Sequence, residues 1–540
     1  MDFIVKDNPD SLILPHTVLA GFICSETAGN PEVTERLLRN IITRIGHILN
    51  ATPHTIKLLC NDSGCGSEAV LRILDNPDES VSPLPVTLYL PASPENHDTS
   101  GDHHGSGTGQ MELVRRSTEI RVISAIEPSG SDYSISPVHE ALIRECDILI
   151  VASRGRPDED PDFVDILRFA RLIGRSLFFI NLSSGSVIEM RNHDRYLETL
   201  EHFNTYNKES VNRAAFDATM QRYAEILTKK IIRSGIPADV VKPLCRTIMP
   251  SFVRADMLAR HYHTLYKMAG NVVYALSALA VFTITVQTLF FPHILWIVWL
   301  EVLEIAVIIV FLVGSRVGEW HRKWIDYRFL AERTRAAFFL CVICIRCHKP
   351  VSTQYTTLAH RPNDWMVLAF ERILDMRPIE FCRLDIPFHA LKMFLLNAWV
   401  DNRLNFYTVA SDENNKKYNR YAYIGESIFF ITLIIAVVHA TGLEYTETDL
   451  IPSFPFILAL LTITLPAAGA ALAAIRVQRE YLKNSERYAS IMRHLSSVRN
   501  QIHAAEDMNT LCSLLEEVND LTMSEELDWR ITFRFRDLEA

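Results

Sequence analysis

Four stretches of the chain are apolar on all sides and approach or reach the length of a membrane-spanning helix. A helix needs about 20 apolar residues to cross the hydrocarbon layer of a bilayer. The four stretches are 272–291, 294–313, 424–440 and 456–475. Helices buried in a soluble core are rarely this long and this apolar. The pattern therefore predicts two transmembrane hairpins, and the alternative is two buried hairpins in a soluble core.

Basic residues flank both predicted hairpins at the ends away from their short loops. The loop at 441–452 contains three acidic residues and neither lysine nor arginine. By the positive-inside rule, the basic ends face the cytoplasm and both loops are external. We therefore expect a multi-pass protein of the cell inner (plasma) membrane, with both termini cytoplasmic. The flanking residues are Arg254, Arg260, Lys267, Arg316, Arg322, Lys323, Lys416, Lys417, Arg420, Arg476, Arg479 and Lys483.

The segment 1–190 has a different pattern, in which short apolar runs alternate with amphipathic ones. Such alternation predicts a mostly parallel sheet covered by helices, as in Rossmann-type domains. The expected fold class is an α/β Rossmann-like N-terminal domain followed by an all-α four-helix transmembrane region with cytosolic amphipathic helices. Strands are predicted at 17–24, 56–60, 85–90, 120–126, 146–152 and 176–181, and helices at 31–49, 67–75, 137–145 and 162–173.

These patterns divide the chain into successive parts. The segment 92–117 is rich in Gly, Ser and His without an apolar period, which predicts a loop inside the first domain. The expected parts are an α/β sensor domain at 1–190, a helical connector at 191–268, a first transmembrane hairpin with its cytosolic helix at 269–348, a cytosolic helical linker at 349–421, a second hairpin with its helix at 422–503, and a C-terminal tail at 504–540.

Composition and charge narrow the class of protein. The net charge of -10 argues against a nucleic-acid binder. The ten cysteines are scattered, which suits a reducing cytosol better than a secreted disulfide framework. The N-terminal sequence has no signal-peptide pattern. Cys341, Cys344, Cys347 and His348 lie in one predicted helix without a second ligand pair, so we expect no metal site.

Two turns that follow predicted strands are the candidate ligand-binding positions, because ligands of open α/β sheets bind at the carboxyl ends of strands. Glycines in the first turn allow close backbone approach, and the helix that follows offers free N–H groups to a phosphate. Two arginines in the second turn suit a phosphate as well. The alternatives are a plain tight turn and a solvated loop. The candidate residues are Ser63, Gly64, Gly66, Ser67 and Glu68 in the first turn, and Arg154, Gly155 and Arg156 in the second.

Three polar residues interrupt the first predicted hairpin. Glu301 and Glu304 are three positions apart and therefore share a helix face. Gln287 is the strongly polar residue of the preceding span. A carboxylate facing lipid is costly, so this face is expected to meet protein or water. One interpretation is a pore-lining or gating set in an oligomer; the other is an interhelical hydrogen bond or a position at headgroup level.

An amphipathic helix is predicted directly after the second span, where aromatic residues repeat at helical spacing. A similar stripe, from Tyr481 to Leu495, follows the fourth span, so the two halves of the membrane region look like a degenerate repeat. We expect the first helix to couple the cytosolic domain to the spans. Its candidate coupling residues are Trp320, Trp324, Tyr327, Arg328, Glu332 and Arg335.

The segments 56–74 and 145–182 resemble the SLOG superfamily of Rossmann-like nucleotide sensors. In that family, a glycine-containing turn after a strand binds nucleotide phosphates, so the resemblance implies a nucleotide-derived ligand and no further cofactor. This chain has the sequence PDEDP at 157–161, where the family often has a GGT-like turn. It also lacks the PGGxGT motif of the phosphoribohydrolase branch, so we expect no hydrolase activity.

The string WIDYRFLAERTR at 324–335, which follows a two-span hairpin, resembles the SLATT group of bacterial membrane effectors. The segments 250–270 and 394–422 are also similar to such proteins. The resemblance implies a homo-oligomeric effector that forms a pore or disrupts the lipid bilayer in an anti-phage or stress system. Two alternatives stay open. One is a membrane-anchored enzyme that processes an NAD-like nucleotide, with Glu68 as its candidate carboxylate. The other is a constitutive channel or transporter with a cytosolic assembly domain.

Overall fold

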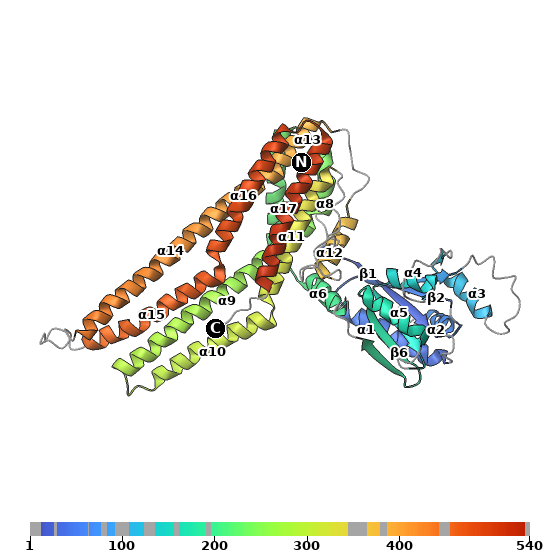
Figure 1. Cartoon of the computed structure of the whole chain (residues 1–540), viewed down its shortest axis with the longest axis horizontal. Helices are drawn as coiled ribbons and strands as arrows, with labels where there is room; N and C mark the ends of the chain where they lie inside the picture. Colours follow the sequence, from blue (N-terminus) through green and yellow to red (C-terminus); the bar gives the residue numbers. More distant parts are fainter. Residues whose placement is uncertain are drawn as a thin grey trace. The chain divides into compact units, whose positions relative to one another are not determined.

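The chain consists of two compact units (Figure 1). The sheet unit contains Asp7–Ser210 and Lys349–Asp375, and the helical unit contains Met1–Lys6, Val211–His348 and Met376–Ala540. The sheet unit thus extends past the expected domain boundary at 190 and takes in a segment from the middle of the chain. The computed structural model describes residues 12–25, 30–62, 64–76, 84–91, 107–123, 135–155, 161–190, 196–343, 364–377, 386–441 and 454–534.

A seven-stranded sheet forms the centre of the sheet unit. Its strand order is β4-β3-β2-β1-β5-β6-β7, and every neighbouring pair is parallel except β6 and β7. The predicted, mostly parallel α/β domain is therefore confirmed. The sequence pattern does not predict β7, a short edge strand whose side chains are exposed or half-buried. The strands are β1 (His16–Cys24), β2 (His54–Asn61), β3 (Val86–Leu90), β4 (Glu119–Val122), β5 (Ile148–Ser153), β6 (Ser176–Asn181) and β7 (Ser186–Met190).

Helices cover both faces of this sheet. On one face α1, α2, α3 and α6 enclose a core around Ile42 and Leu58, and on the other face α4 and α5 enclose a core around Leu149 and Phe179. The prediction of a loop at 92–117 is wrong for its C-terminal part, because α3 forms there and places Leu113 in the first core. The helices are α1 (Pro31–Ile48), α2 (Gly64–Asp75), α3 (Gly107–Arg116), α4 (Pro137–Glu145), α5 (Pro161–Leu172) and α6 (Tyr196–Lys208).

The helix α12 (Trp365–Asp375) belongs to the sheet unit, although its sequence lies between the two membrane hairpins. The ring of Trp365 packs on that of Tyr206 in α6, with 5.3 Å between the ring centroids. Ile373 of the same helix is fully buried. The chain that connects the two hairpins therefore passes through the sheet unit.

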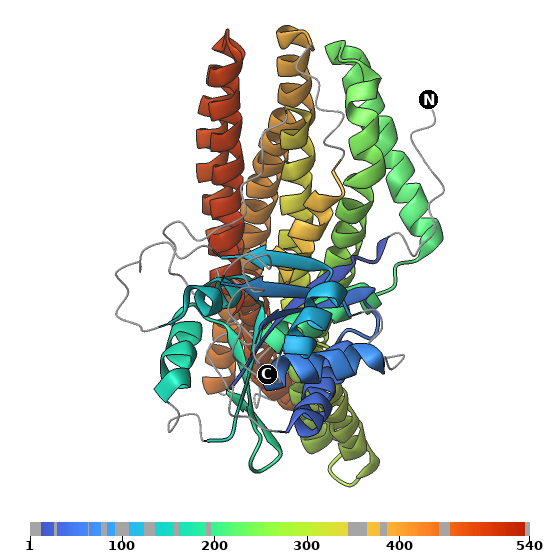
Figure 2. The ribbon, with the colours of Figure 1, turned by 90° about the vertical axis from the view of Figure 1, so that its right-hand side faces the viewer.

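The helical unit contains four helices that are long and apolar enough to cross a membrane, as predicted. The helices α9 and α10 form one hairpin, and α14 and α15 form the other (Figure 1). Both α9 and α14 continue beyond their apolar spans as polar halves, against which α11 and α16 pack (Figure 2). The helices are α7 (Arg213–Ser234), α8 (Ala238–Thr247), α9 (Met249–Phe290), α10 (Trp296–Val317), α11 (Trp320–Val342), α13 (Phe388–Leu395), the π-helical turn η4 (Leu396–Val400), α14 (Asp401–Ala440), α15 (Phe454–Arg479), α16 (Tyr481–Ala504) and α17 (Met508–Arg534).

The same arrangement occurs twice in this unit. In α9-α10-α11 and again in α14-α15-α16, a long helix is followed by a return span and then by a helix that packs on the polar half of the first. The turn before the third helix is repeated in detail. Glu319 and Glu480 both adopt the left-handed conformation, with φ of 50° and 46°. The N–H groups of Lys323 and Asn484 each donate to the carbonyl of this glutamate at 2.9 Å.

The segment expected to be a C-terminal tail contains a packed helix. Leu511, Leu515 and Val518 of α17 are fully buried, and α17 contacts both α11 and α16. Their spacing of four and three residues places these side chains on one face of α17. The face of α17 that carries these three residues is therefore part of the helical unit's core.

Candidate functional site

The two predicted ligand turns lie at the same edge of the sheet. The strands β2, β1 and β5 are adjacent, and the first turn follows β2 while the second follows β5. Strands β1 to β4 are added in sequence order toward one side of the sheet, and β5 to β7 toward the other. The strand order therefore reverses between β1 and β5. A switch point of this kind is where open α/β sheets form their ligand crevices. The backbone N–H of Ser25, just after β1, donates to Ala152 of β5 at 2.9 Å and joins the two strand ends.

In the first turn, α2 begins at Gly64, and the chain buries Gly66 and Ser67. The Ser67 hydroxyl donates to the carboxylate of Asp62 at 3.3 Å. Glu68 is exposed and forms an ion pair with Arg72, one helical turn on, at 3.1 Å. Glu68 therefore lies on the exposed surface of α2, where its carboxylate pairs with Arg72. Ser63 lies outside the described residues.

In the second turn, backbone and hydroxyl groups fix the chain at the end of β5. The hydroxyl of Ser183 donates to the carbonyl of Arg154 at 2.6 Å, and the N–H of Gly155 donates to the hydroxyl of Ser153 at 3.4 Å. The side chain of Arg154 is exposed. Arg156, the second arginine of the prediction, lies outside the described residues. The turn is therefore an ordered position that carries the exposed residue Arg154.

Two cysteines at this edge were not predicted as site residues. Cys24 ends β1, and Cys65 lies in the first turn of α2. The interaction with the Cys24 thiol, together with hydrogen bonds from Thr34 and the backbone of Asn30, outweighs burial and lowers the pKa of Cys65 to about 6. The pKa of Cys24 is raised by the same contact and by burial. The position of Cys65 between Gly64 and Gly66 places it in the predicted first turn, although the thiol was not part of that prediction.

In the first membrane hairpin, one of the predicted polar residues forms a hydrogen bond between α9 and α10. The hydroxyl of Thr283 donates to the carboxylate of Glu304 at 3.0 Å, and both side chains are buried. Glu301 and Gln287 are half-buried. Glu304 therefore makes an interhelical hydrogen bond within a single chain. A pore-lining or gating role for these three residues stays a prediction.

The aromatic stripe of the predicted coupling helix packs on α9. The ring of Trp324 stacks on His263 with 4.5 Å between centroids and on Tyr266 with 5.6 Å. Tyr327 meets Tyr262 edge to face at 5.6 Å. Trp320 joins the same cluster. These contacts attach α11 to the polar half of α9, directly before the first span begins.

The charged residues of the coupling helix connect it to other helices. Glu332 pairs with Arg335 at 2.5 Å and also contacts Arg403 of α14. Burial opposes ionisation of Glu332, but these two guanidinium groups keep its pKa below the usual value. Arg328 lies 4.0 Å from the buried Glu525 of α17. The network therefore joins the first repeat to the second and to the C-terminal helix.

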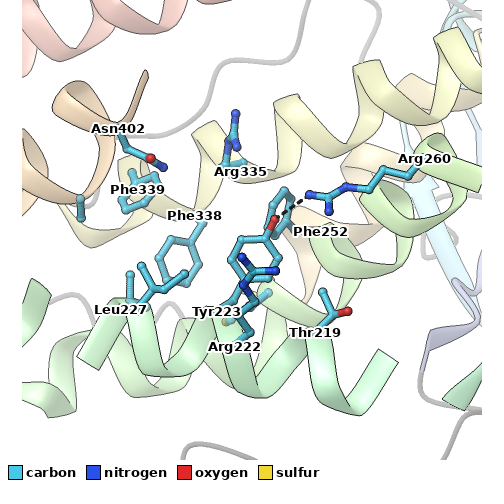
Figure 3. Close-up of a pocket in the computed structure, with 13 residues that line it drawn as sticks. Thr219, Arg222, Tyr223, Leu227, Phe252, Arg260, Arg335, Phe338, Phe339 and Asn402 are labelled. Carbon is cyan, nitrogen blue, oxygen red and sulfur yellow. Dashed lines mark hydrogen bonds between the residues drawn. The ribbon is translucent and has the colours of Figure 1, made fainter. Parts of the chain in front are cut away.

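A cavity of about 360 Å³ lies beside this network, between α7, α9 and α11 (Figure 3). Phe252 and Phe338 line its apolar side. Arg260 donates to the hydroxyl of Tyr223 at 3.3 Å, and Arg335 lies over the ring of Phe252. Cavities of this size, lined by aromatic groups with a few convergent polar ones, are typical of small-molecule sites. Of its lining residues, only Arg335 was among the predicted site residues; Phe338 lies on the same helix, whereas Tyr223 and Phe252 come from α7 and α9.

No family model, curated protein or solved structure matches this chain. Its function is therefore argued from the fold and from these positions. Among the residues that the structure describes, no cluster of His, Cys, Asp or Glu has the arrangement of a metal site. Cys344, Cys347 and His348 lie outside that part of the chain.

Proposed function

We propose that this protein is a ligand-gated effector of the plasma membrane, with both termini in the cytoplasm. In this proposal, the sheet unit binds a nucleotide-derived ligand at the edge formed by β2, β1 and β5. Binding changes how the spans pack, and ions or small solutes then cross the bilayer. The resemblance of 145–182 to SLOG sensors and of 324–335 to SLATT effectors supports a role in bacterial anti-phage or stress responses.

The observation that carries the proposal is the continuity of α9 and α14. They contain 42 and 40 residues and run without interruption from the polar bundle into the apolar spans. At about 1.5 Å per residue, each is about 60 Å long, twice the hydrocarbon thickness of about 30 Å. A displacement of either polar half must therefore move the span attached to it.

Exposed apolar surface supports a homo-oligomer. Few side chains of the four spans are buried within one chain. Trp299 on α10 and Phe430 on α14 are among the large exposed ones. Lipid covers part of such a surface, and neighbouring subunits can cover the rest. A conducting path also needs polar groups, and Glu301, Glu304 and Gln287 are the residues that we assign to it.

The test is solute release from liposomes that contain the full-length protein. A fluorescent dye is enclosed, and release is followed after adding NAD, mononucleotides or cyclic oligonucleotides. We expect one of these ligands to speed release about fivefold or more, the lower end of ordinary allosteric coupling. Arg154→Ala should abolish the response, because it removes a cation at the ligand edge. Arg168→Ala, an exposed arginine on α5, is the matched control and should respond like the wild type.

Two other results would support the alternative functions. Release that is equally fast without any ligand would indicate a constitutive channel. Conversion of the added nucleotide, followed by chromatography of the same samples, would indicate a membrane-anchored enzyme. A well-folded protein that neither releases dye nor converts any ligand would contradict the proposed effector function.

A further inference from the structure

A second cavity, of about 460 Å³, lies in the helical unit where the polar halves of α9 and α14 meet α11 and the junction of α15 and α16. Its lining is strongly basic. Seven basic side chains face it together with two acidic ones: Arg260, Lys267, Arg328, Arg335, Arg403, Lys417 and Arg479, with Asp256 and Glu332. An excess of cations of this kind attracts anionic ligands.

Carboxylates neutralise only part of this charge, and one of them, Glu413, lies outside the lining and pairs with Lys417 at 3.2 Å. Asp256 pairs with Arg260 at 2.8 Å, and Glu332 is occupied by Arg335 and Arg403. In contrast, Lys267 and Arg479 form no ion pair among the residues that the structure describes.

Arg479 is held in place by neutral acceptors. Its guanidinium donates to the carbonyl of Lys267 at 2.9 Å and to the amide oxygen of Asn271 at 3.1 Å. Its Nε–H is buried without a hydrogen-bond acceptor within the described part of the chain. Buried donors are normally satisfied, and an unsatisfied one costs stability. The charge of Arg479, which no carboxylate of the described residues compensates, therefore favours an anion in this cavity.

The neighbouring titratable groups report the same positive field. His263 lines the cavity, and burial together with Lys267, Arg479 and Arg328 lowers its pKa to about 4. The pKa of Lys267 is lowered by burial, then by Arg479 and Lys417. Each cation thus disfavours the charged form of its neighbours, and a bound anion would relieve this repulsion.

The position of the cavity mouth suggests which anions reach it. Lys267 lies five residues before the span at 272–291, Lys417 lies seven before that at 424–440, and Arg479 lies four after that at 456–475. At about 1.5 Å per residue these are distances of about 6 to 10 Å. That is close to the depth of the headgroup layer on either side of the hydrocarbon core.

We propose that this cavity is a second ligand site, which binds a phosphate-bearing anion between Lys267, Lys417 and Arg479. The phosphate belongs either to the headgroup of an anionic lipid or to a soluble polyphosphate compound, because both present the same chemistry. These three residues come from α9, α14 and α15, so the anion bridges the two repeats. The site is independent of the nucleotide position at the sheet edge and goes beyond the function proposed above.

The test uses the full-length protein and separates the two sources of phosphate. In one arm the protein is placed in phosphatidylcholine nanodiscs with or without phosphatidylglycerol, and lipid retained on the protein is counted by native mass spectrometry. In the other, inorganic pyrophosphate is titrated into lipid-free protein in neutral detergent and followed by calorimetry. Binding in either arm identifies the source of the phosphate.

Matched lysine variants decide whether the binding occurs in the cavity. Lys267→Gln and Lys417→Gln should each weaken it about tenfold or more, the usual effect of losing a charge-assisted hydrogen bond. Both lysines are exposed, so the variants should fold. Lys416→Gln removes the same charge one residue away, outside the lining, and should bind like the wild type. Absence of binding in both arms, or equal losses in Lys416→Gln and Lys417→Gln, would overturn the proposal.

Discussion

At the residue scale, the sheet edge contains a pair of cysteines with opposite ionisation behaviour. Cys65 ionises first, because its interaction with the Cys24 thiol lowers its pKa and because it lies in the first turn of α2, where the helix dipole favours an anion. Cys24 is correspondingly held as a thiol. A thiolate at this position would contribute a negative charge beside the proposed ligand position.

This ionisation can be measured by alkylation. The rate at which iodoacetamide modifies Cys65 should rise with pH through a midpoint near 6, because only the thiolate reacts. In Cys24→Ala the midpoint should move upward, since the largest stabilising hydrogen bond is lost. Peptide mass spectrometry resolves each site, and Cys512, whose pKa burial raises, is the internal reference. A wild-type midpoint as high as that of Cys512 would contradict the thiol contact.

At the element scale, the repeated turn between span and helix is strained in both copies. Glu319 and Glu480 occupy the left-handed region, which costs about 1 kcal/mol for a residue with a Cβ atom. Strain of this kind persists only where the surrounding structure imposes it. In both copies the strained residue lies where a span joins the helix that packs back on the bundle, which is where a change in bundle packing would reach the span.

Glycine at the first of these positions should therefore stabilise the protein. Glu319→Gly removes the strain, and it loses only a partly exposed ion pair with Arg322, which contributes little. We expect the free energy of unfolding in detergent to increase by about 1 kcal/mol or less. The matched control is Glu486→Gly in the exposed, regular part of α16, which should cost about 1 kcal/mol. Equal destabilisation by both variants would show that Glu319 is not strained.

The same scale explains how much of the fold was predictable. The four spans and six strands follow from apolar runs whose length and spacing allow few other structures. The missed elements lack that signal. In α3, the anchor Leu113 lies in a segment that is otherwise rich in glycine and histidine, and β7 exposes most of its side chains. Tertiary packing determines these two elements, and the local pattern of apolar and polar residues does not indicate them.

The sites were predictable only where one short segment contains them. The sequence places both candidate turns directly after strands, as the structure has them, and their ligand stays a prediction. The basic cavity was not, because its residues are spread from Asp256 to Tyr488 and meet only through the packing of several helices. Lys267 and Arg479 were noticed in the sequence, but as charges that orient the spans. Their place in the lining of the cavity depends on how helices distant in sequence pack together, which the sequence does not show.

At the scale of the whole molecule, the chain passes repeatedly between its two units. It leaves the helical unit after His348, contributes α12 to the sheet unit, and returns at Met376 to begin the second repeat. Trp365 and Ile373 fix α12 within the sheet unit. One helix of the sheet unit, α12, therefore lies in sequence between the two repeats, and the chain connects this unit covalently to both. A ligand bound there can influence both hairpins without a separate linker protein.

That reasoning requires the sheet unit and the basic cavity to lie on the same side of the membrane, which cysteine labelling can test. The wild-type chain has no cysteine in the loop at 292–295 or in that at 441–453. A maleimide that cannot cross membranes should therefore leave it unlabelled in intact cells, whereas His293→Cys should become labelled. Permeabilised cells, in which Cys512 becomes accessible, provide the control for reagent and expression. Labelling of the wild type in intact cells would mean the reverse orientation, because its cysteines all lie outside these two loops. The sheet edge and the cavity would then face the exterior, and a cytoplasmic nucleotide could not be the ligand of either.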